Sequence, residues 1–466
     1  MPQLFLIFST ILLILTSVAR AQNQSRPNVL LIFTDDQGSL DMNCYGSEDL
    51  QTPYMDALAA AGVRFTHFYS AAPVCSPSRA GLLTGRTPLR AGLPGNVPIP
   101  FHREGAGLPT EEVTIAEMLK DGGYKTGHVG KWHLGHSPEK QPTGQGFDYS
   151  FGHMVGCIDN YSHFFYWDGP NQHDLWRNGE EVYYPGQFFP DLMVEEANQF
   201  LEQNQDTTFF LYWAINVPHY PYQGSPEWLE TYADLPSPRR EYAAFVSTMD
   251  EKIGAVLDKL DQLGLRENTL VIFQSDHGHS VEERAMFGGG NAGEYRGAKF
   301  SLFEGGIRVP AIASWPGVLP EGEVRNQLAV GTDWLPTIAD LCEVAHPQTV
   351  LDGKSLAPLL RDASLASPHE TVYWQIGRDE SSHWAVRQGN WKLIGRPRDP
   401  VQPDRLTVAD SLFLSNLSED ISESTNLASQ HPQKMEELRQ LYQQWLDEVM
   451  QENQLVPVAF ALVRLA

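Results

Sequence analysis

The sequence predicts an α/β fold: a large domain with a mainly parallel sheet sandwiched by helices, followed by a small C-terminal α+β subdomain with an antiparallel sheet. Apolar runs suited to buried strands alternate with polar loops and helical segments through most of the chain. Past about residue 345, short alternating strands replace that pattern. The 466 residues, 42% of them hydrophobic, also exceed the size at which one hydrophobic core usually divides.

The elements of the larger domain follow one another as strand, polar loop and helix. Residues 28–33 form a continuous apolar run with a bias to β-branched side chains, which favours a strand buried on both faces. Glycine follows or closes each helical segment, as expected at helix C-termini. The other expected strands are 63–65, 125–129, 208–215 and 269–274, and the expected helices are 53–62, 113–119 and 242–263.

The C-terminal part has a different texture. Gly389-Asn390 is typical of a hairpin turn between two short strands. Residues 433–452 form a polar, amphipathic helical pattern. We therefore expect the larger domain at 22–345 and the smaller at 346–466. The expected short antiparallel strands are 373–376, 384–387 and 391–394.

The N-terminus predicts export. Residues 4–18 are almost wholly apolar, and Ala19-Arg20-Ala21 supplies a small-x-small cleavage site, so 1–21 is predicted to be a secretory signal peptide. The apolar run is short for a membrane span, although an uncleaved anchor is the alternative. No later stretch is apolar enough to cross a bilayer. We expect a periplasmic or secreted protein with no integral membrane segment.

The composition constrains the partners. The chain has 33 basic and 58 acidic residues, a net charge of -25. Such a surface repels nucleic acid and anionic lipid, so no nucleic-acid partner is expected. A site for an anion must then concentrate its cations locally.

The four cysteines are spaced like neither a zinc site nor a dense disulfide framework. Cys44, Cys157 and Cys342 are interpreted as small buried apolar side chains. One or two disulfide bridges are the alternative in an oxidising compartment.

Polar residues follow four of the expected strands. Because ligands bind at the carboxyl ends of the strands in such sheets, we expect these residues to share one edge. Carboxylates there suit Ca²⁺ or Mg²⁺ better than softer metals, although the first two aspartates alone would fit a helix N-cap equally well. The residues are Asp35, Asp36, Lys131, His133, His219, Asp276 and His277.

One segment resembles a known signature. The run Cys75-Ser76-Pro77-Ser78-Arg79, followed by Ala-Gly-Leu-Leu-Thr-Gly, is similar to the motif of type I, formylglycine-dependent sulfatases in the alkaline-phosphatase-like superfamily. The stretches 127–135, 303–310 and 389–393 resemble further landmarks of that family. The resemblance covers nearly the whole chain after the signal peptide. It implies a sulfatase catalytic domain at 22–345.

The resemblance implies two cofactors. Cys75 would be oxidised to formylglycine (3-oxoalanine) by a formylglycine-generating enzyme or an anaerobic sulfatase-maturating enzyme. One Ca²⁺ would be bound by Asp35, Asp36, Asp276 and His277, together with Cys75. His277 departs from the commoner family residue, Asn, and imidazole also suits transition metals.

The resemblance also implies the catalytic roles. The hydrated aldehyde at Cys75 would attack sulfur and form a covalent sulfo-enzyme. Arg79 and Lys131 would stabilise charge on the formylglycine and sulfate oxygens. His133 would be the base that releases sulfate. His219 and Lys299 would bind sulfate and help to protonate the departing alcohol.

The sequence indicates the substrate less clearly than it indicates the reaction. The resemblance favours a sulfated polysaccharide or oligosaccharide as substrate. Alternatives are small aryl sulfates, a phosphomonoester or phosphonate monoester, or glycan binding without catalysis if Cys75 stays unconverted. The segment 145–190 is equally consistent with substrate contact and with packing; its aromatic and histidine residues include Phe151, His153, Tyr161, His163, Trp167, His173 and Trp176.

Overall fold

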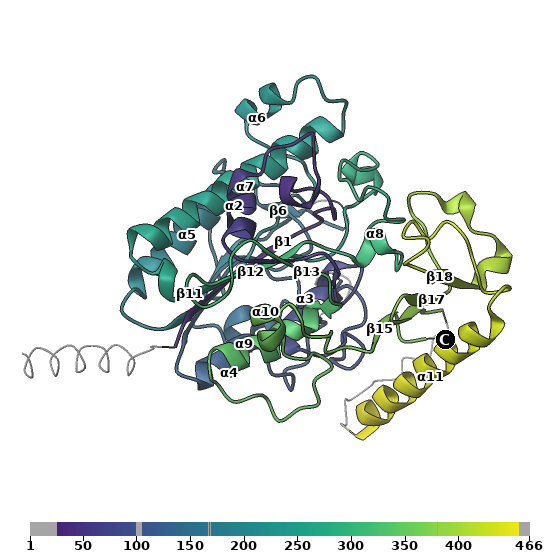
Figure 1. Ribbon diagram of the computed structural model, residues 1–466. Helices are drawn as coiled ribbons and strands as arrows, with labels where there is room; N and C mark the ends of the chain where they lie inside the picture. The colour runs from purple at the N-terminus through teal and green to yellow at the C-terminus, as the bar shows by residue number, and fades with distance from the viewer. Residues whose placement is uncertain (1–25, 99–104, 166, 168, 380, 456–466) are drawn as a thin grey trace, which may run out of the picture.

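The computed structural model describes residues 26–98, 105–165, 167, 169–379 and 381–455 (Figure 1). The predicted signal peptide, 1–21, lies outside these residues. Within them, no helix combines the length and the apolar character needed to span a bilayer. The predicted fold class is confirmed, because a large, mostly parallel sheet with helices is joined to a small antiparallel sheet.

The large sheet has ten strands, and its centre is parallel. The adjacent strands β11, β1, β10, β4 and β5 all run in the same direction. Antiparallel strands extend both edges, through β12 beside β11 and β8 beside β5. The order is β13 (Glu323–Arg325), β2 (Val63–Phe65), β12 (Ala311–Ser314), β11 (Thr269–Ser275), β1 (Asn28–Thr34), β10 (Phe209–Ala214), β4 (Lys125–Lys131), β5 (Tyr149–His153), β8 (Trp176–Arg177) and β9 (Glu180–Glu181).

Helices cover both faces of this sheet because its central strands are apolar on both sides. Along β1, Leu30 and Ile32 pack into one core, whereas Leu31 and Phe33 pack into the other. The first core lies under α2 (Pro53–Ala60), α5 (Phe189–Gln203) and α7 (Arg239–Gln262), and the second under α3 (Cys75–Thr84), α4 (Ile115–Asp121), α9 (Trp334–Leu341) and α10 (Ala357–Arg361). In Figure 1 the first group lies above the strands and the second below.

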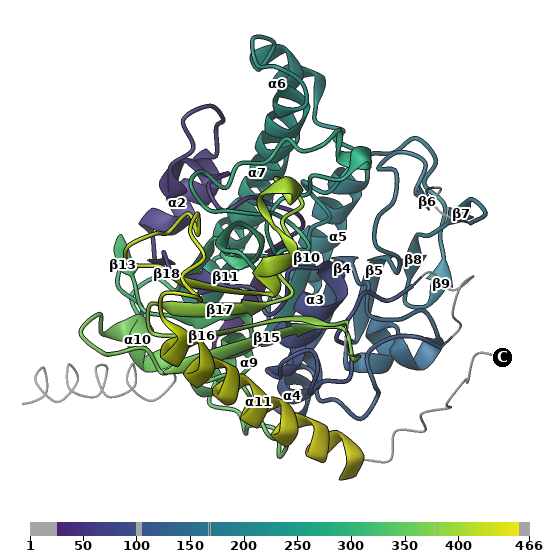
Figure 2. The ribbon, with the colours of Figure 1, turned by 90° about the vertical axis from the view of Figure 1, so that its right-hand side faces the viewer.

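The small sheet packs against the last helix. Its order follows the chain, and all three pairings are antiparallel. Trp384 stacks on Tyr442 of the helix with ring centroids 3.9 Å apart, and Figure 2 shows the helix crossing the sheet. The elements are β15 (Thr371–Ile376), β16 (His383–Gln388), β17 (Trp391–Gly395), β18 (Leu412–Asn416) and α11 (Pro432–Leu455).

The sequence prediction missed helices α3, α5 and α9 and strands β5, β12 and β18, besides a set of short elements. The two-residue strands carry too little pattern to be predicted: β8, β9, β3 (Phe68–Tyr69), β14 (Ala329–Val330), β6 (Phe164–Phe165) and β7 (Gln172–His173). The short helices α6 (Pro226–Thr231) and α8 (Glu304–Ile307) were likewise not expected. The division at 345/346 remains a proposal, and the packing of α10 against α9 would extend the larger unit to about residue 361.

The four cysteines are free of disulfide bonds. Cys157 and Cys342 are buried, as predicted for small apolar side chains, and Cys44 is half-buried. Cys75 is buried at the start of α3.

Candidate active site

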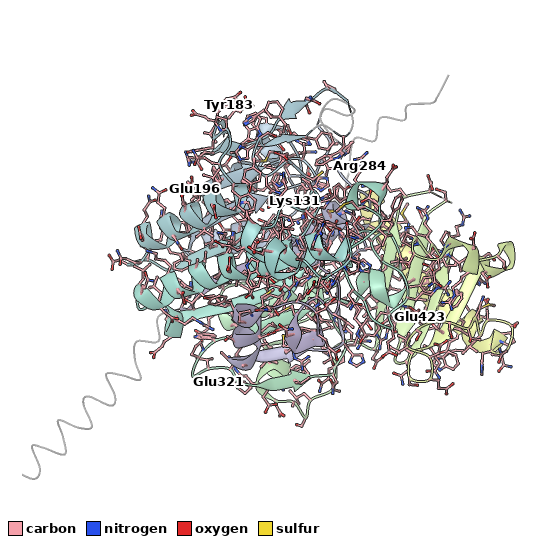
Figure 3. The ribbon with its side chains drawn as sticks, turned by 90° about the horizontal axis from the view of Figure 1, so that it is seen from above. Lys131, Tyr183, Glu196, Arg284, Glu321 and Glu423 are labelled. Carbon is pink, nitrogen blue, oxygen red and sulfur yellow. The ribbon has the colours of Figure 1, made fainter. Side chains whose placement is uncertain are left out.

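The parallel centre of the sheet brings four strand ends to one edge. Asp35 and Asp36 follow β1, Lys131 ends β4, and Asp276 follows β11. His219 lies five residues beyond β10, which separates β1 from β4 in the sheet. Figure 3 shows Lys131 near the middle of the larger unit. The predicted convergence of these residues is therefore observed, although their chemical roles remain a prediction.

Helix α3 delivers Cys75 to this edge at its first position. Asn96 accepts a hydrogen bond from the backbone N–H of Ser76 (3.1 Å), which satisfies one free donor of the helix start. Ser78 ties the first turn to the β11 loop by donating to the carbonyl oxygen of Asp276 (2.6 Å). Cys75 Sγ then lies 3.3 Å from His277 Nε2.

The carboxylates gather around the same point. One donor atom each from Asp35, Cys75, Asp276 and His277 lies within 4.8 Å of the others. The backbone N–H of Asp36 donates to Asp276 Oδ1 (3.0 Å), and Asp36 holds a left-handed backbone (φ 61°). Residues with such angles carry strain of about 1–3 kcal/mol and cluster at functional sites. Asp36 Oδ1 is buried with no hydrogen-bond partner.

Three long cations neutralise part of this charge. Lys131 Nζ contacts both oxygens of Asp35, at 2.9 and 2.7 Å. The guanidinium of Arg79 lies 3.3 Å from Asp35 and 3.4 Å from Asp276. Lys299 Nζ donates to Asp36 Oδ2 (3.0 Å). The acidic protein thus concentrates cations at one buried place, as a site for an anion requires.

The pKa values show that the nearby cations offset the burial of the carboxyl groups only in part. Burial raises the pKa of Asp36 to about 8 even though Lys299 and His277 oppose it. Burial likewise raises the pKa of Asp276 to about 7. Burial also opposes ionisation of Asp35, but Lys131, His219 and Arg79 hold its pKa well below the ordinary value. Without a further cation, two of the three carboxyl groups resist ionisation.

The surroundings of Cys75 are electropositive. Burial raises the pKa of the Cys75 thiol, but Lys131 and Lys299 more than offset it, and the pKa falls to about 6. The thiolate form is therefore favoured near neutral pH, and thiolates are the reactive form of cysteine.

Backbone carbonyl groups orient four histidines at this edge. His219 and His277 each bond through Nδ1 to a nearby carbonyl oxygen (2.8 and 2.9 Å), and His133 does so through Nε2 to Val97 (3.2 Å). His153 Nδ1 pairs with Val155 in the same way (3.0 Å). A ring nitrogen facing a carbonyl must donate, so in each neutral ring the other nitrogen is the acceptor.

The residues present fit a hard divalent cation. Asp36 Oδ1 is a buried oxygen that lacks a hydrogen-bond partner. Ligand atoms of Asp35, Cys75, Asp276 and His277 form one close group, and those of Asp36, Cys75 and His219 form a second group that shares Cys75. The Nε2 of His277 points into the group, 3.5 Å from Asp36 Oδ1 and 3.4 Å from Asp276 Oδ2. Three carboxylates and one imidazole suit Ca²⁺ or Mg²⁺ first, as predicted from the residue types.

The structure places two further residues near the site: His153, for which the sequence left substrate contact and packing equally open, and Glu282, which the sequence did not assign. His153 is fully buried, pairs in register with Lys131, and has an unpartnered Nε2. Glu282 contacts Lys299 (3.5 Å) and accepts a hydrogen bond from the hydroxyl of Tyr220 (3.2 Å). Neither belongs to a motif, and only the proximity of Glu282 to Asp276 in sequence could have suggested it.

Some residues of the segment 145–190 fit packing, and others fit substrate contact. Phe151 and His153 are buried in β5, which supports packing. Tyr161 is 41% exposed and stacks on Phe188, whereas His173 and Trp176 line a cavity.

Comparison with known proteins gives a consistent result. The family described as Sulfatase matches residues 27–344, and the family described as N-sulphoglucosamine sulphohydrolase, C-terminal, matches residues 293–452. Arylsulfatase A of Homo sapiens is 36% identical over 457 residues, covering 89% of this chain and 87% of the relative. N-acetylgalactosamine-6-sulfatase of Canis lupus familiaris is 38% identical over 362 residues, covering 73% of this chain and 67% of the relative.

Solved structures share the fold. Ps i-CgsB in complex with k-i-k-neocarrahexaose superposes with a TM-score of 0.81 at 29% identity, covering 90% of this chain and 93% of that chain. Phosphonate monoester hydrolase of Agrobacterium radiobacter superposes with a TM-score of 0.64 at 19% identity, covering 92% and 96%. At that identity, the second likeness shows the fold alone.

Proposed function

The chain belongs to the sulfatase family of the alkaline-phosphatase-like superfamily and is a sulfuric ester hydrolase, and we propose that it removes sulfate from a sulfated carbohydrate with a formylglycine at position 75 and one Ca²⁺. The observation that carries the mechanism is the 3.3 Å contact between Cys75 Sγ and His277 Nε2 inside the buried carboxylate cluster. The nucleophile position and the candidate metal ligands thus share one point.

The ion would be held by Asp35, Asp36, Asp276 and His277. Bound there, a divalent cation supplies a charge that polarises the sulfate oxygens and offsets the negative charge of the ester. His277 is compatible with this role because its Nδ1 donates to the carbonyl of Gly278 (2.9 Å), which leaves Nε2 as the ligand atom.

Conversion of the Cys75 thiol to a hydrated aldehyde would supply two hydroxyl groups on one carbon. One would attack sulfur as the sulfur–oxygen bond to the alcohol breaks. Loss of the proton from the other would then let the carbon–oxygen bond break, which would release sulfate and restore the aldehyde. His133 is suited to take that proton, because its Nε2 donates to Val97 and its buried Nδ1 has no partner. A maturation enzyme that oxidises Cys75 is the protein partner we propose, because the segment from Cys75 to Arg79 resembles the motif that such an enzyme reads.

The remaining residues bind and orient the ester. Arg79 and Lys131 present buried positive charge beside Asp35, where it can stabilise the sulfate oxygens. His219 Nε2 lies 3.3 Å from Lys299 Nζ, so the pair can hold a proton for the departing alcohol.

Two relatives support a carbohydrate substrate. One is named for its action on N-acetylgalactosamine 6-sulfate, and one solved neighbour binds a carrageenan oligosaccharide. Aryl sulfates are the second candidate, because another relative is an arylsulfatase. The signal-like segment 1–21 supports a periplasmic or secreted location. We propose 22–345 as the catalytic domain.

The test is expression with a maturation enzyme, followed by mass spectrometry of the Cys75 peptide and assay of sulfate release. We expect conversion to the aldehyde and release of sulfate from at least one sulfated glycan. Full conversion with no release from any glycan or aryl sulfate would contradict the proposal. An unconverted Cys75 with retained glycan binding would favour a binding protein instead. Faster hydrolysis of an aryl phosphate than of the matching sulfate would favour the phosphoester alternative.

A further inference from the structure

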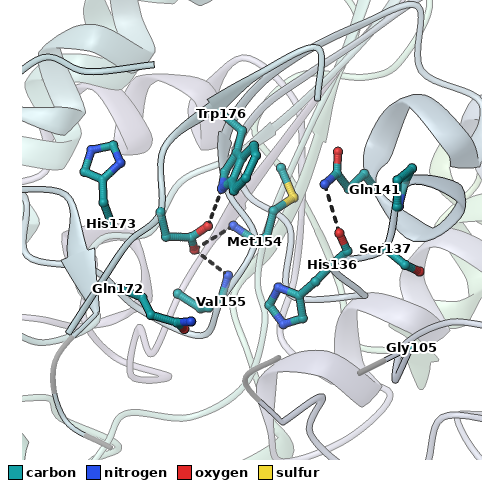
Figure 4. A pocket seen from close by; sticks show the side chains of 11 residues that line it. Gly105, His136, Ser137, Gln141, Met154, Val155, Gln172, His173 and Trp176 are labelled. Atoms are coloured by element: carbon teal, nitrogen blue, oxygen red, sulfur yellow. Dashed lines mark hydrogen bonds between the residues drawn. The ribbon is translucent and has the colours of Figure 1, made fainter. Parts of the chain in front are cut away.

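A cavity of about 350 Å³ is lined in part by residues of the loops that follow β4 and β5 (Figure 4). Its size falls in the range of roughly 300–1,000 Å³ typical of ligand pockets. Met154 and Val155 line one side, and Trp176, His136 and Gln172 also line it.

The cavity walls continue from the strand ends that carry the catalytic candidates. Met154 and Val155 come directly after His153, whose backbone pairs with Lys131. The next residue, Gly156, lies so close to His133 that a β-carbon there would be 3.0 Å from the imidazole. His136 follows His133 by three residues. The cavity therefore lies next to His133, at the same edge of the sheet as the candidate active site.

One buried carboxylate fixes the shape of the cavity. Asp174 accepts hydrogen bonds from the backbone N–H groups of Met154 (2.9 Å) and Val155 (2.7 Å) and from the indole N–H of Trp176 (2.6 Å). Figure 4 shows these three bonds as dashed lines. Both oxygens are therefore occupied by neutral donors, and the indole is held in one orientation before any ligand enters.

The lining is mostly apolar and aromatic, with a few polar groups. Among the described residues that line the cavity, none is lysine or arginine. His136 contributes a neutral ring, because burial and nearby His133 lower its pKa to about 4, and its Nε2 has no partner. An aromatic indole with imidazole and amide groups suits the faces and hydroxyl groups of a sugar.

We propose that this cavity is a subsite for an uncharged sugar ring linked to the sulfated residue, so that the substrate is a sparsely sulfated, otherwise neutral glycan. The inference rests on the proposed function and narrows its substrate class. A second sulfate or a carboxylate on the neighbouring sugar would meet no lysine or arginine among the described lining residues and would lose its hydration uncompensated. The net charge of -25 adds long-range repulsion of polyanions.

The first experiment compares two substrates. The kcat/KM for a monosulfated, otherwise neutral disaccharide is divided by that for a small aryl sulfate. We expect His136→Ala and Gln172→Ala each to lower this ratio about three- to tenfold, the effect of one lost hydrogen bond. An unchanged ratio in both variants would overturn the subsite. Loss of all sulfate release from converted wild-type protein would instead reject the proposed function.

The second experiment reverses the charge preference. Gln172→Lys should raise, by about threefold or more, the kcat/KM for a disaccharide with a second sulfate on the neighbouring sugar relative to the monosulfated one. Gln199→Lys is the matched control, because Gln199 lines a separate cavity with Tyr149 and Phe200 and its change should leave that preference unaltered. Wild-type protein that prefers the disulfated substrate, or a Gln172→Lys variant with wild-type preference, would overturn the proposal.

Discussion

Two buried charge clusters in this protein differ in whether all their carboxylate oxygens have partners. The rim cluster consists of Asp35, Asp36, Asp276 and His277 with their cations Arg79, Lys131 and Lys299. The interdomain cluster consists of Glu304, Lys392, Glu423 and Arg308, and it joins α8 of the large unit to β17 and the loop after β18. Glu423, labelled in Figure 3, lies on the side of the C-terminal subdomain.

The interdomain cluster is closed. Glu304 receives Lys392 (2.8 Å) on one oxygen and the hydroxyl of Tyr69 (2.6 Å) on the other. Glu423 receives Lys392 (2.9 Å) and Ser415 (3.0 Å) on one oxygen and the backbone N–H of Glu304 (2.7 Å) on the other. Every carboxylate oxygen therefore has a partner, which is the condition under which buried charges are tolerated.

The rim cluster is open, because one of its carboxylate oxygens, Asp36 Oδ1, is buried without a hydrogen-bond partner. Burial disfavours ionisation of Glu304, but Lys392 and two arginines lower its pKa to about 2, whereas burial raises the pKa of Asp36 to about 8. Each cluster also holds a carboxyl group whose pKa shifts the other way, because burial raises the pKa of Glu423 and nearby cations lower that of Asp35. The clusters therefore differ in their hydrogen-bond partners: the closed cluster joins two parts of the protein, whereas the open one is arranged to receive a charged ligand.

The largest expected effect is the loss of activity when Cys75 beside the rim cluster is replaced. Cys75→Ala should lower sulfate release at least about 10³-fold, because it removes the nucleophile, while stability changes little. The assay is single-substrate kinetics on an aryl sulfate. Cys342→Ala, which removes a buried thiol remote from the rim, is the matched control. Comparable losses in both variants would contradict the assignment of Cys75.

The next effect breaks the closed cluster. Lys392→Met should lower the free energy of unfolding by about 3–5 kcal/mol, because two buried glutamates lose their shared cation. Denaturant unfolding measures this change. Lys259→Met removes a surface ion pair with Glu202 (2.9 Å) and should cost less than about 1 kcal/mol. Equal costs would mean that the interdomain cluster is not closed by Lys392.

Removing and restoring Ca²⁺ should change the stability of the protein through the rim cluster and not through the interdomain cluster, with a somewhat smaller effect. A ligand present at 100 times its Kd stabilises a folded protein by about 3 kcal/mol, so chelation should lower both the Tm and the activity of the wild type. Added Ca²⁺ should restore both. The same addition should not repair Lys392→Met, whose defect lies elsewhere. A wild-type Tm indifferent to chelator and to Ca²⁺ would argue against an open cation site.

The smallest expected effect on stability comes from replacing one carboxyl group by an amide in each of the two clusters. In chelator at pH 8, Glu304→Gln should lower stability by about 1–3 kcal/mol because a paired buried carboxylate is lost. The contribution of Glu304 is present above its ordinary pKa of 4.5 and disappears as the pH falls towards 2. Asp276→Asn should leave stability equal or higher, because it relieves repulsion among crowded carboxylates. Thermal unfolding of both variants decides the signs, and equal losses would contradict the comparison.

Much of the catalytic edge could be predicted from local sequence. Asp35 and Asp276 each follow an apolar run long enough to be recognised as a buried strand, and the polarity of parallel strands places such residues together. The motif at Cys75 is contiguous, so its resemblance needs no tertiary information. By contrast, the stretches around Glu304 and Lys392 resembled family landmarks without revealing that these two residues form an ion pair 88 positions apart.

By itself, the sequence determined the alternation of strands and helices, the family, and the residue types at the carboxyl edge, because periodicity, turn residues and contiguous motifs are local properties. Only the tertiary structure decided which charges are compensated, which histidine nitrogens are free, and where the cavity beside His136 lies. These features depend on contacts between segments that are distant in the chain. Because a buried charge is costly unless it is paired, the presence or absence of each such contact decides whether that charge is stable.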